Sequence, residues 1–181
     1  MKKVIKLKSE GKSDEEIKTL CIDDNLFGAI NTKRARRMYG YILNRVNRLD
    51  EQMIQLFEIS DLSTQKIINL ISILEGDRLF FEFIFEVYRE QVILGSDELN
   101  EFDLNVFFKN KEVQSEDINK WIDKTKKRLG SAYFNFMRDA NLITLVDKKK
   151  TITPPVLDIE LEKYLEINGK KSLVKAIRGS S

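Results

Sequence analysis

Apolar residues recur at helical spacing over most of the chain, and one segment combines this spacing with an unmixed run of positive charge. In residues 31–49 the apolar side chains lie three or four positions apart, which places them on one stripe of an α-helix and predicts that the stripe is buried. Most of the basic residues repeat the same spacing about 100° around the helix axis and form a second, exposed stripe. The apolar stripe consists of Ala35, Met38, Ile42, Val46 and Leu49.

The predicted helix over residues 31–49 contains basic residues but no aspartate or glutamate. Like charges at neighbouring helical positions repel by roughly a few tenths of a kcal/mol per pair, so a sequence that keeps them unpaired indicates a surface that meets phosphate groups. A solvated basic face is the alternative. The candidate binding residues are Lys33, Arg34, Arg36, Arg37, Tyr41, Arg45 and Arg48.

Capping signals and the same apolar period predict further helices. Ser13 and Glu16 have the spacing of a capping box, Asp103 is expected to cap a short helix, and Ser115 is expected to open the last long helix before the hairpin. That long helix has Ile122 in its core-facing band, and Gly130 predicts a bend or a break. In addition to the helix capped by Ser13, the predicted helices cover residues 2–10, 31–49, 50–60, 63–74, 78–94, 104–110, 115–140, 157–167 and 171–177.

After Asn141 the hydrophobic period changes from 3.6 to 2, which is the spacing of a β-strand. Residues 142–146 predict one strand, residues 147–150 a turn, and residues 151–153 the returning strand, which Pro154 ends. A hairpin directly behind a basic helix has the order of a winged helix, whose tip would present Lys148, Lys149 and Lys150 to a phosphate. A hairpin that only packs on the core stays open as the alternative.

These elements predict a mainly α-helical protein, a helical bundle of two packed helical subdomains. Residues 1–76 form the N-terminal subdomain, in which the order short helix, glycine turn, helix, loop and helix is helix-turn-helix-like. Residues 77–181 form the C-terminal subdomain, which is winged-helix-like and has one β-hairpin at residues 142–153.

The net charge of +2 conceals a strong division along the chain. Residues 1–50 sum to +5, residues 51–119 to −10 and residues 120–150 to +6. Separate basic patches are the electrostatic footprint of nucleic-acid binding. The second basic zone adds the candidate binding residues Lys120, Lys124, Lys126, Lys127 and Arg128.

The residue types present exclude several kinds of chemistry. The chain has no histidine, so a histidine base, a histidine-activated nucleophile and a histidine metal ligand are impossible. One cysteine, Cys21, cannot build a zinc site or an internal disulfide, and no phosphate-binding P-loop sequence occurs. We therefore expect a protein that is not an enzyme and needs neither a cofactor nor a metal.

The apolar runs and the aromatic residues of the sequence predict where the protein is located and which kind of nucleic acid it binds. No secretory signal opens the chain and charges interrupt every apolar run, so we expect a cytoplasmic protein without membrane contact. Only Tyr39 and Tyr41 are aromatic on the expected basic faces, which disfavours a stacking platform for single strands. We expect duplex DNA binding with little sequence preference, because phosphate contacts position a protein without specifying bases.

Two other functions stay open. The first is a protein adaptor, in which the acidic middle of the chain, residues 82–103, docks a basic partner while the arginine-rich helix binds an acidic one. This acidic middle contains Glu82, Glu86 and Glu90 at four-residue spacing. RNA binding is the other alternative. The sequence predicts no oligomeric state.

A set of short motifs runs along nearly the whole chain. These motifs are S-x-E-E-I at residues 13–17, R-A-R-R at 34–37, N-R-V-N-R-L at 44–49, V-Y-R-E at 87–90, F-F-K-N-K at 107–111, W-I-D-K-T-K-K-R-L at 121–129 and I-x-P-P at 152–155. The set resembles the BrxA family, a component of the bacterial BREX phage-resistance systems that has been described as NusB-like. The resemblance implies an all-helical DNA-binding accessory protein of a host-defence system. It also implies that other BREX proteins are partners, and that these carry out methylation and any ATP use.

Overall fold

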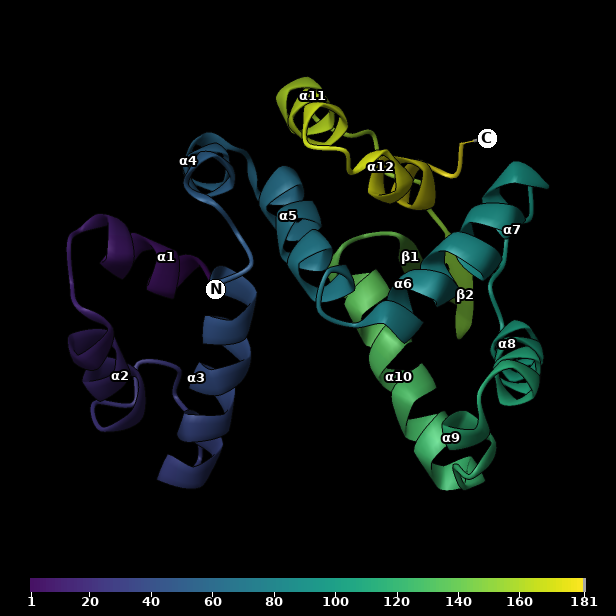
Figure 1. Ribbon diagram of the computed structural model, residues 1–181, viewed down its shortest axis with the longest axis horizontal. Coiled ribbons are helices and arrows are strands. Elements are labelled where there is room, and N and C mark those ends of the chain that lie inside the picture. The colour runs from purple at the N-terminus through teal and green to yellow at the C-terminus, as the bar shows by residue number, and fades with distance from the viewer. Residues whose placement is uncertain (181) are drawn as a thin grey trace. The chain divides into compact units, whose positions relative to one another are not determined.

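The computed structural model describes residues 1–180 and is mainly α-helical, with one two-stranded antiparallel hairpin over these residues. The predicted fold class is therefore confirmed. The chain divides into two compact units, residues 1–60, called unit 1, and the residues from 61 onward, called unit 2 (Figure 1). The division precedes the position predicted from the sequence because α5 (Leu62–Leu74) packs on elements of unit 2.

Unit 1 contains α1 (Lys2–Ser9), α2 (Asp14–Ile22), α3 (Thr32–Val46) and α4 (Glu51–Ile59). The predicted capping box is present at α2, where the Ser13 Oγ accepts from the Glu16 N–H and the Glu16 carboxylate accepts from the Ser13 N–H. Cys21 is fully buried, so it is a core residue, and burial raises the pKa of its thiol. The three helices α1, α2 and α3 pack on one another in this unit.

Unit 2 is built around α5 and a cluster of aromatic side chains. Phe80 stacks on Tyr133 with ring centroids 4.6 Å apart, and Phe83 packs edge-on against Phe107 at 5.2 Å. The elements of this unit after α5 are α6 (Arg78–Phe83), η1 (Ile84–Tyr88), α7 (Arg89–Ile93), α8 (Glu101–Gln114), α9 (Glu116–Asn119), α10 (Asp123–Asp139), β1 (Ile143–Val146), β2 (Lys149–Ile152), α11 (Ile159–Ile167) and α12 (Lys171–Arg178).

The predicted helix over residues 78–94 is present but contains a π-helical turn, η1. A π-turn adds one residue per turn and rotates the side chains that follow it relative to those before it. Tyr88 at its end is completely buried, and burial raises the pKa of its hydroxyl, which has no hydrogen-bond partner within residues 1–180. The spacing of four along this helix therefore does not keep residues in one line.

The long helix predicted over residues 115–140 is interrupted, but not at Gly130. The helical path breaks between α9 and α10, so Ile122 precedes α10 and is exposed instead of buried. Gly130 lies inside α10, buried where α8 approaches, and a Cβ built on it would stand 2.0 Å from the Leu104 Cδ2. The glycine is therefore explained by a close helix contact. The start of α8 also differs from the prediction, because Asn100 is its N-cap.

Replacing Gly130 with alanine should destabilise unit 2. The added methyl group forces the buried Leu104 side chain to move, and such overpacking costs roughly 1–3 kcal/mol of unfolding free energy. Gly40→Ala is the matched control, because Gly40 also lies inside a helix and its Cβ would meet nothing within 4 Å. That change should raise the unfolding free energy by roughly 0.5–1 kcal/mol in urea titrations. Equal effects of the two changes would contradict this interpretation.

The hairpin is confirmed, with a tighter turn than the sequence predicted. β1 and β2 pair antiparallel, Val146 opposite Lys149, and the turn consists of Asp147 and Lys148, both with positive φ. Such a two-residue turn matches the twist of the strands. The outer edge of β2 is covered by residues 97–99, where the Leu99 N–H donates to the Lys150 carbonyl.

Candidate nucleic-acid interface

The helix α3 is positioned by its N-cap and by its buried face. The Asn31 side chain accepts a hydrogen bond from the Arg34 N–H at 2.9 Å, which fixes the start of the helix. Ala35 and Val46 are buried as predicted, whereas Met38 and Ile42 of the predicted stripe are only half-buried.

Tyr39 does not lie on the basic face where the sequence placed it. Its ring is buried in unit 1, and its hydroxyl donates to the carbonyl oxygen of Asp14 at 3.4 Å. Burial, with a smaller contribution from the nearby Asp14 carboxylate, raises the pKa of this hydroxyl. Tyr41, by contrast, is 66% exposed. The basic face of α3 therefore presents a single tyrosine.

The cationic side chains of α3 and the turn after it point to solvent, apart from Arg45, which is half-buried. No carboxylate of the described residues 1–180 forms an ion pair with the exposed ones. Arg48 donates from Nη1 to the Asn44 carbonyl at 3.0 Å, which holds its guanidinium beside the end of the helix. We call the exposed set the α3 face: Lys33, Arg34, Arg36, Arg37, Tyr41 and Arg48.

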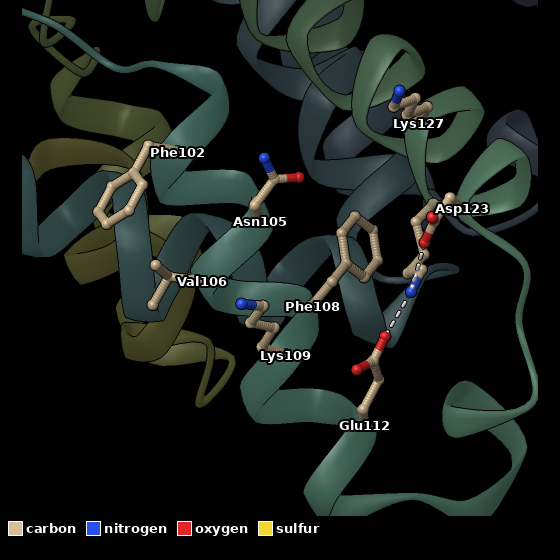
Figure 2. Close-up of a pocket in the computed structure, with 9 residues that line it drawn as sticks. Phe102, Asn105, Val106, Phe108, Lys109, Glu112, Asp123 and Lys127 are labelled. Carbon is tan, nitrogen blue, oxygen red and sulfur yellow. Dashed lines mark hydrogen bonds and ion pairs between the residues drawn. The ribbon is translucent and has the colours of Figure 1, made fainter.

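The basic residues near α10 divide into paired and unpaired ones. Lys126 is half-buried with its Nζ 2.5 Å from a Glu112 carboxylate oxygen and 3.1 Å from Asp123 (Figure 2). The hydrogen bonds to these two carboxylates raise the pKa of Lys126. Lys120 has a longer, exposed contact with Asp117 at 3.8 Å. Of the five candidate binding residues between positions 120 and 128, Lys124, Lys127 and Arg128 are exposed and form no ion pair within residues 1–180.

The three hairpin lysines have three different surroundings, so the prediction that all of them lie at the tip is wrong. Lys148 alone is in the turn. Lys149 is in β2 with its Nζ 2.6 Å from a Glu98 carboxylate oxygen, and this hydrogen bond raises its pKa. The Lys150 ammonium lies over the Phe134 ring, 4.5 Å from its centroid.

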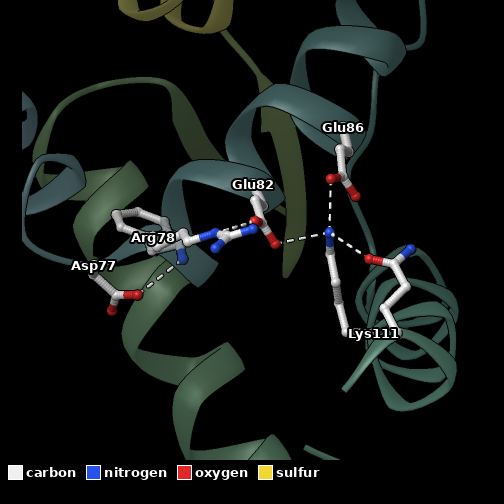
Figure 3. Close-up of polar contacts among 7 residues, drawn as sticks. Asp77, Arg78, Glu82, Glu86 and Lys111 are labelled. Atoms are coloured by element: carbon white, nitrogen blue, oxygen red, sulfur yellow. Dashed lines mark hydrogen bonds and ion pairs between the residues drawn. The ribbon is translucent and has the colours of Figure 1, made fainter.

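The glutamate row of residues 82, 86 and 90 is not a free acidic surface. The ammonium of Lys111, whose side chain is only 5% exposed, lies 2.8 Å from Glu82 and 2.7 Å from Glu86 (Figure 3). Arg78 also binds Glu82, and Glu90 pairs instead with Arg89. The acidic docking surface considered from the sequence is therefore largely occupied by internal cations.

Lys111 was not singled out from the sequence, although its position carries a signal. It follows Leu104, Phe107 and Phe108 at the spacing of one helical stripe, so a charged residue occupies a core-facing position. Burial would lower the pKa of Lys111, but the hydrogen bonds to Glu82 and Glu86 outweigh it and the pKa is raised. The hydrogen bond from Lys111 correspondingly lowers the pKa of Glu82, against the opposing effect of burial.

The described residues contain neither a candidate metal cluster nor a membrane-spanning helix. Within residues 1–180, no group of three or more histidine, cysteine, aspartate and glutamate side chains is arranged to hold a metal ion. No helix in the same part of the chain combines the length and the apolar character needed to cross a membrane.

Comparison with known proteins decides the family. The BrxA family profile matches residues 1–169. The chain belongs to the BrxA family. A BREX protein BrxA from Bacillus cereus (strain H3081.97) is 32% identical over 169 residues, which cover 93% of this chain and 84% of that protein. The resemblance seen in the sequence motifs is thereby confirmed, and it extends through unit 1 and most of unit 2.

A solved structure shares the fold. The crystal structure of an uncharacterized protein from Magnetospirillum magneticum superposes with a TM-score of 0.80, covering 98% of this chain and 90% of that one. The sequences are 16% identical, so the likeness extends to the arrangement of helices and not to function. The fold of this BrxA family member therefore also occurs in a protein of very different sequence.

Proposed function

We propose that this chain is a non-catalytic component of a BREX anti-phage system and that it binds double-stranded DNA through the α3 face. Family membership and the Bacillus cereus BREX relative support the place in BREX. The observation that carries DNA binding is a helix whose exposed cations have no carboxylate partners within residues 1–180. Elsewhere in the chain, Lys111, Lys126 and Lys149 are each neutralised by internal carboxylates.

The dimensions of α3 suit a DNA duplex. α3 has 15 residues and is roughly 22 Å long, and the major groove of B-DNA is wide enough for an α-helix. Guanidinium groups bind phosphates with two parallel hydrogen bonds, and this contact carries no base information. We therefore expect affinity without strong sequence preference.

Duplex RNA is a weaker candidate than duplex DNA. The major groove of A-form RNA is deep and narrow, so side chains of a helix such as α3 cannot enter it in the same way. The predicted helix-turn-helix stays a prediction, and the connection from α2 to α3 over residues 23–31 is longer than the turn of roughly three to four residues typical of that motif. The predicted winged helix also stays a prediction, with Lys148 as the tip residue.

The proposal is tested by a salt titration of binding to a labelled random duplex of about 20 base pairs, measured by fluorescence anisotropy. If four cations of the α3 face contact phosphates, affinity should fall on the order of a hundredfold between about 50 and 200 mM salt. Unlabelled duplex DNA should compete better than duplex RNA of the same sequence. No binding at the lower salt concentration would overturn the proposal, and stronger competition by RNA would replace DNA with RNA as the ligand.

A further inference from the structure

The helix α8 has apolar side chains on two opposite faces. Leu104, Phe107 and Phe108 face the core of unit 2 and are buried. On the opposite side, Phe102 is 72% exposed, Val106 is 40% exposed and Val113 is 90% exposed. A helix at the surface of a protein normally has its apolar side chains on the one face that packs on the core. The second face of α8 therefore has the composition of a contact surface that this chain does not cover.

The exposed face of α8 borders a groove of about 440 Å³ between α8 and α10. Phe102, Val106 and Phe108 line it from α8, and Lys127 lines it from α10 (Figure 2). The positions 102, 106, 109 and 113 follow helical spacing over about 16 Å, which is three turns. This length suits a helix lying along α8, since amphipathic helices bind grooves through side chains at such intervals.

The charges of the groove define what fits it. Lys126 in its wall is already held by Glu112 and Asp123. Lys109 and Lys127 line the same groove, are exposed and form no ion pair within residues 1–180. The groove thus presents apolar side chains beside two ammonium groups that form no ion pair within residues 1–180. Carboxylates next to apolar side chains complement this arrangement.

A nucleic acid fits the groove less well than a protein helix. Phosphates and water would leave the apolar side chains of Phe102 and Val106 exposed, whereas the apolar stripe of a protein helix would bury them. The α3 face has no exposed aliphatic side chain among its members, so it lacks this feature.

We propose that the groove between α8 and α10 binds an amphipathic helix of another BREX protein, one whose apolar stripe is flanked by acidic side chains. The inference rests on the proposed place of the chain in BREX and is independent of DNA binding by α3. In this proposal unit 2 binds the protein partner, and the α3 face of unit 1 binds the DNA. The adaptor predicted from the sequence placed a basic partner on the acidic middle and an acidic partner on the arginine-rich helix, whereas this proposal places an acidic partner on unit 2.

The partner segment can be located by replacing Phe102 with p-benzoylphenylalanine in the full chain, which is produced together with the other BREX proteins of its host. Photo-cross-linked peptides are identified by mass spectrometry. The proposal expects a segment of a different protein with helical apolar spacing and a net negative charge. A cross-link to a basic segment, to nucleic acid or to a second copy of this chain would overturn it, and so would the absence of any protein cross-link.

The identified segment is then synthesised as a labelled peptide, and its affinity for purified variants of this chain is measured. Phe102→Ser, and Lys109→Glu together with Lys127→Glu, should each weaken peptide binding about tenfold or more. The matched controls are Val156→Ser for the exposed apolar residue, and Lys171→Glu with Lys175→Glu for the charges, all of them exposed positions outside the groove. Controls that weaken binding as much as the groove variants would overturn the proposal.

The same proteins separate this proposal from DNA binding. Phe102→Ser should keep full affinity for the DNA duplex while it loses the peptide. Substitutions in the α3 face should weaken DNA binding and leave the affinity for the peptide unchanged. Loss of both ligands in Phe102→Ser would contradict a separate docking groove, whereas failure of DNA binding in every protein, with peptide binding intact, would remove only the α3 proposal.

Discussion

Replacing Arg34 and Arg37 together with glutamate is expected to lower the affinity for duplex DNA on the order of a hundredfold at about 100 mM salt. Both side chains are exposed, lie three positions apart on α3 and have no carboxylate partner within residues 1–180. Each substitution removes one phosphate contact and adds a negative charge that repels the DNA. The slope of log affinity against log salt concentration should also become shallower by about 0.9 for each lost contact. Fluorescence anisotropy over a series of salt concentrations measures both quantities.

Loss of folding would not account for this result. Arg34 lies in the first turn of α3, where the helix dipole favours a negative side chain, so glutamate at this position should keep or slightly raise the melting temperature. Lys171→Glu with Lys175→Glu is the matched control, because it changes the net charge equally on the exposed side of α12. If that control weakened binding as much as the α3 variant, net charge alone would explain the affinity.

Replacing Lys111 with alanine is expected to lower the unfolding free energy of unit 2 by roughly 2–3 kcal/mol. Removing one partner of a buried ion pair leaves the other charge without compensation, at a cost of roughly 3–5 kcal/mol when both partners are fully buried. The value expected here is smaller because Glu82 and especially Glu86 retain contact with water. Urea unfolding followed by the fluorescence of Trp121, the one tryptophan of the chain, measures unit 2 specifically.

Removing all three charges tests whether the effect is electrostatic. The combination Lys111→Met, Glu82→Gln and Glu86→Gln leaves no buried charge unpaired, since Arg78, which loses Glu82, is 92% exposed. It should recover most of the lost stability, because apolar or neutral replacement of a whole buried ion cluster is often tolerated. Lys148→Ala, at the exposed hairpin turn, should change stability by less than about 0.5 kcal/mol. A triple variant no more stable than Lys111→Met alone would contradict an electrostatic cause.

The pH dependence of the Lys111→Ala effect follows from the direction of the pKa shifts. The pKa of Glu82 is lowered in the folded protein, so its contribution is complete above the ordinary glutamate pKa of about 4.3 and is lost as the pH falls through the folded value. The pKa of Lys111 is raised, so its contribution is complete below about 10.4 and is lost as the pH rises through the folded value. The stability difference should be constant between these limits and shrink outside them. A difference that persisted unchanged at pH 3 would contradict an ionic cause.

Comparison of the α3 and α10 zones shows which part of the site could be predicted. The cations of α3 and of the turn after it have no acid among them in the sequence, so local sequence is enough to predict an exposed basic face. Near α10, Lys126 pairs with Asp123, which the local sequence shows, and with Glu112 on α8, which it does not. Two runs of basic residues therefore have different electrostatic surroundings.

The sequence by itself determined the elements that depend on neighbouring residues: the helical fold class, the capping box at Ser13, the buried stripe of α3, the hairpin and the BrxA motifs. The tertiary structure decided which cations stay available, because Lys111 and Lys149 are neutralised by carboxylates 25 and 51 residues away in the chain. It also decided the role of Gly130, whose missing side chain makes room for Leu104 of α8. Contacts of this kind depend on how helices pack, and no local period of apolar and polar residues encodes them.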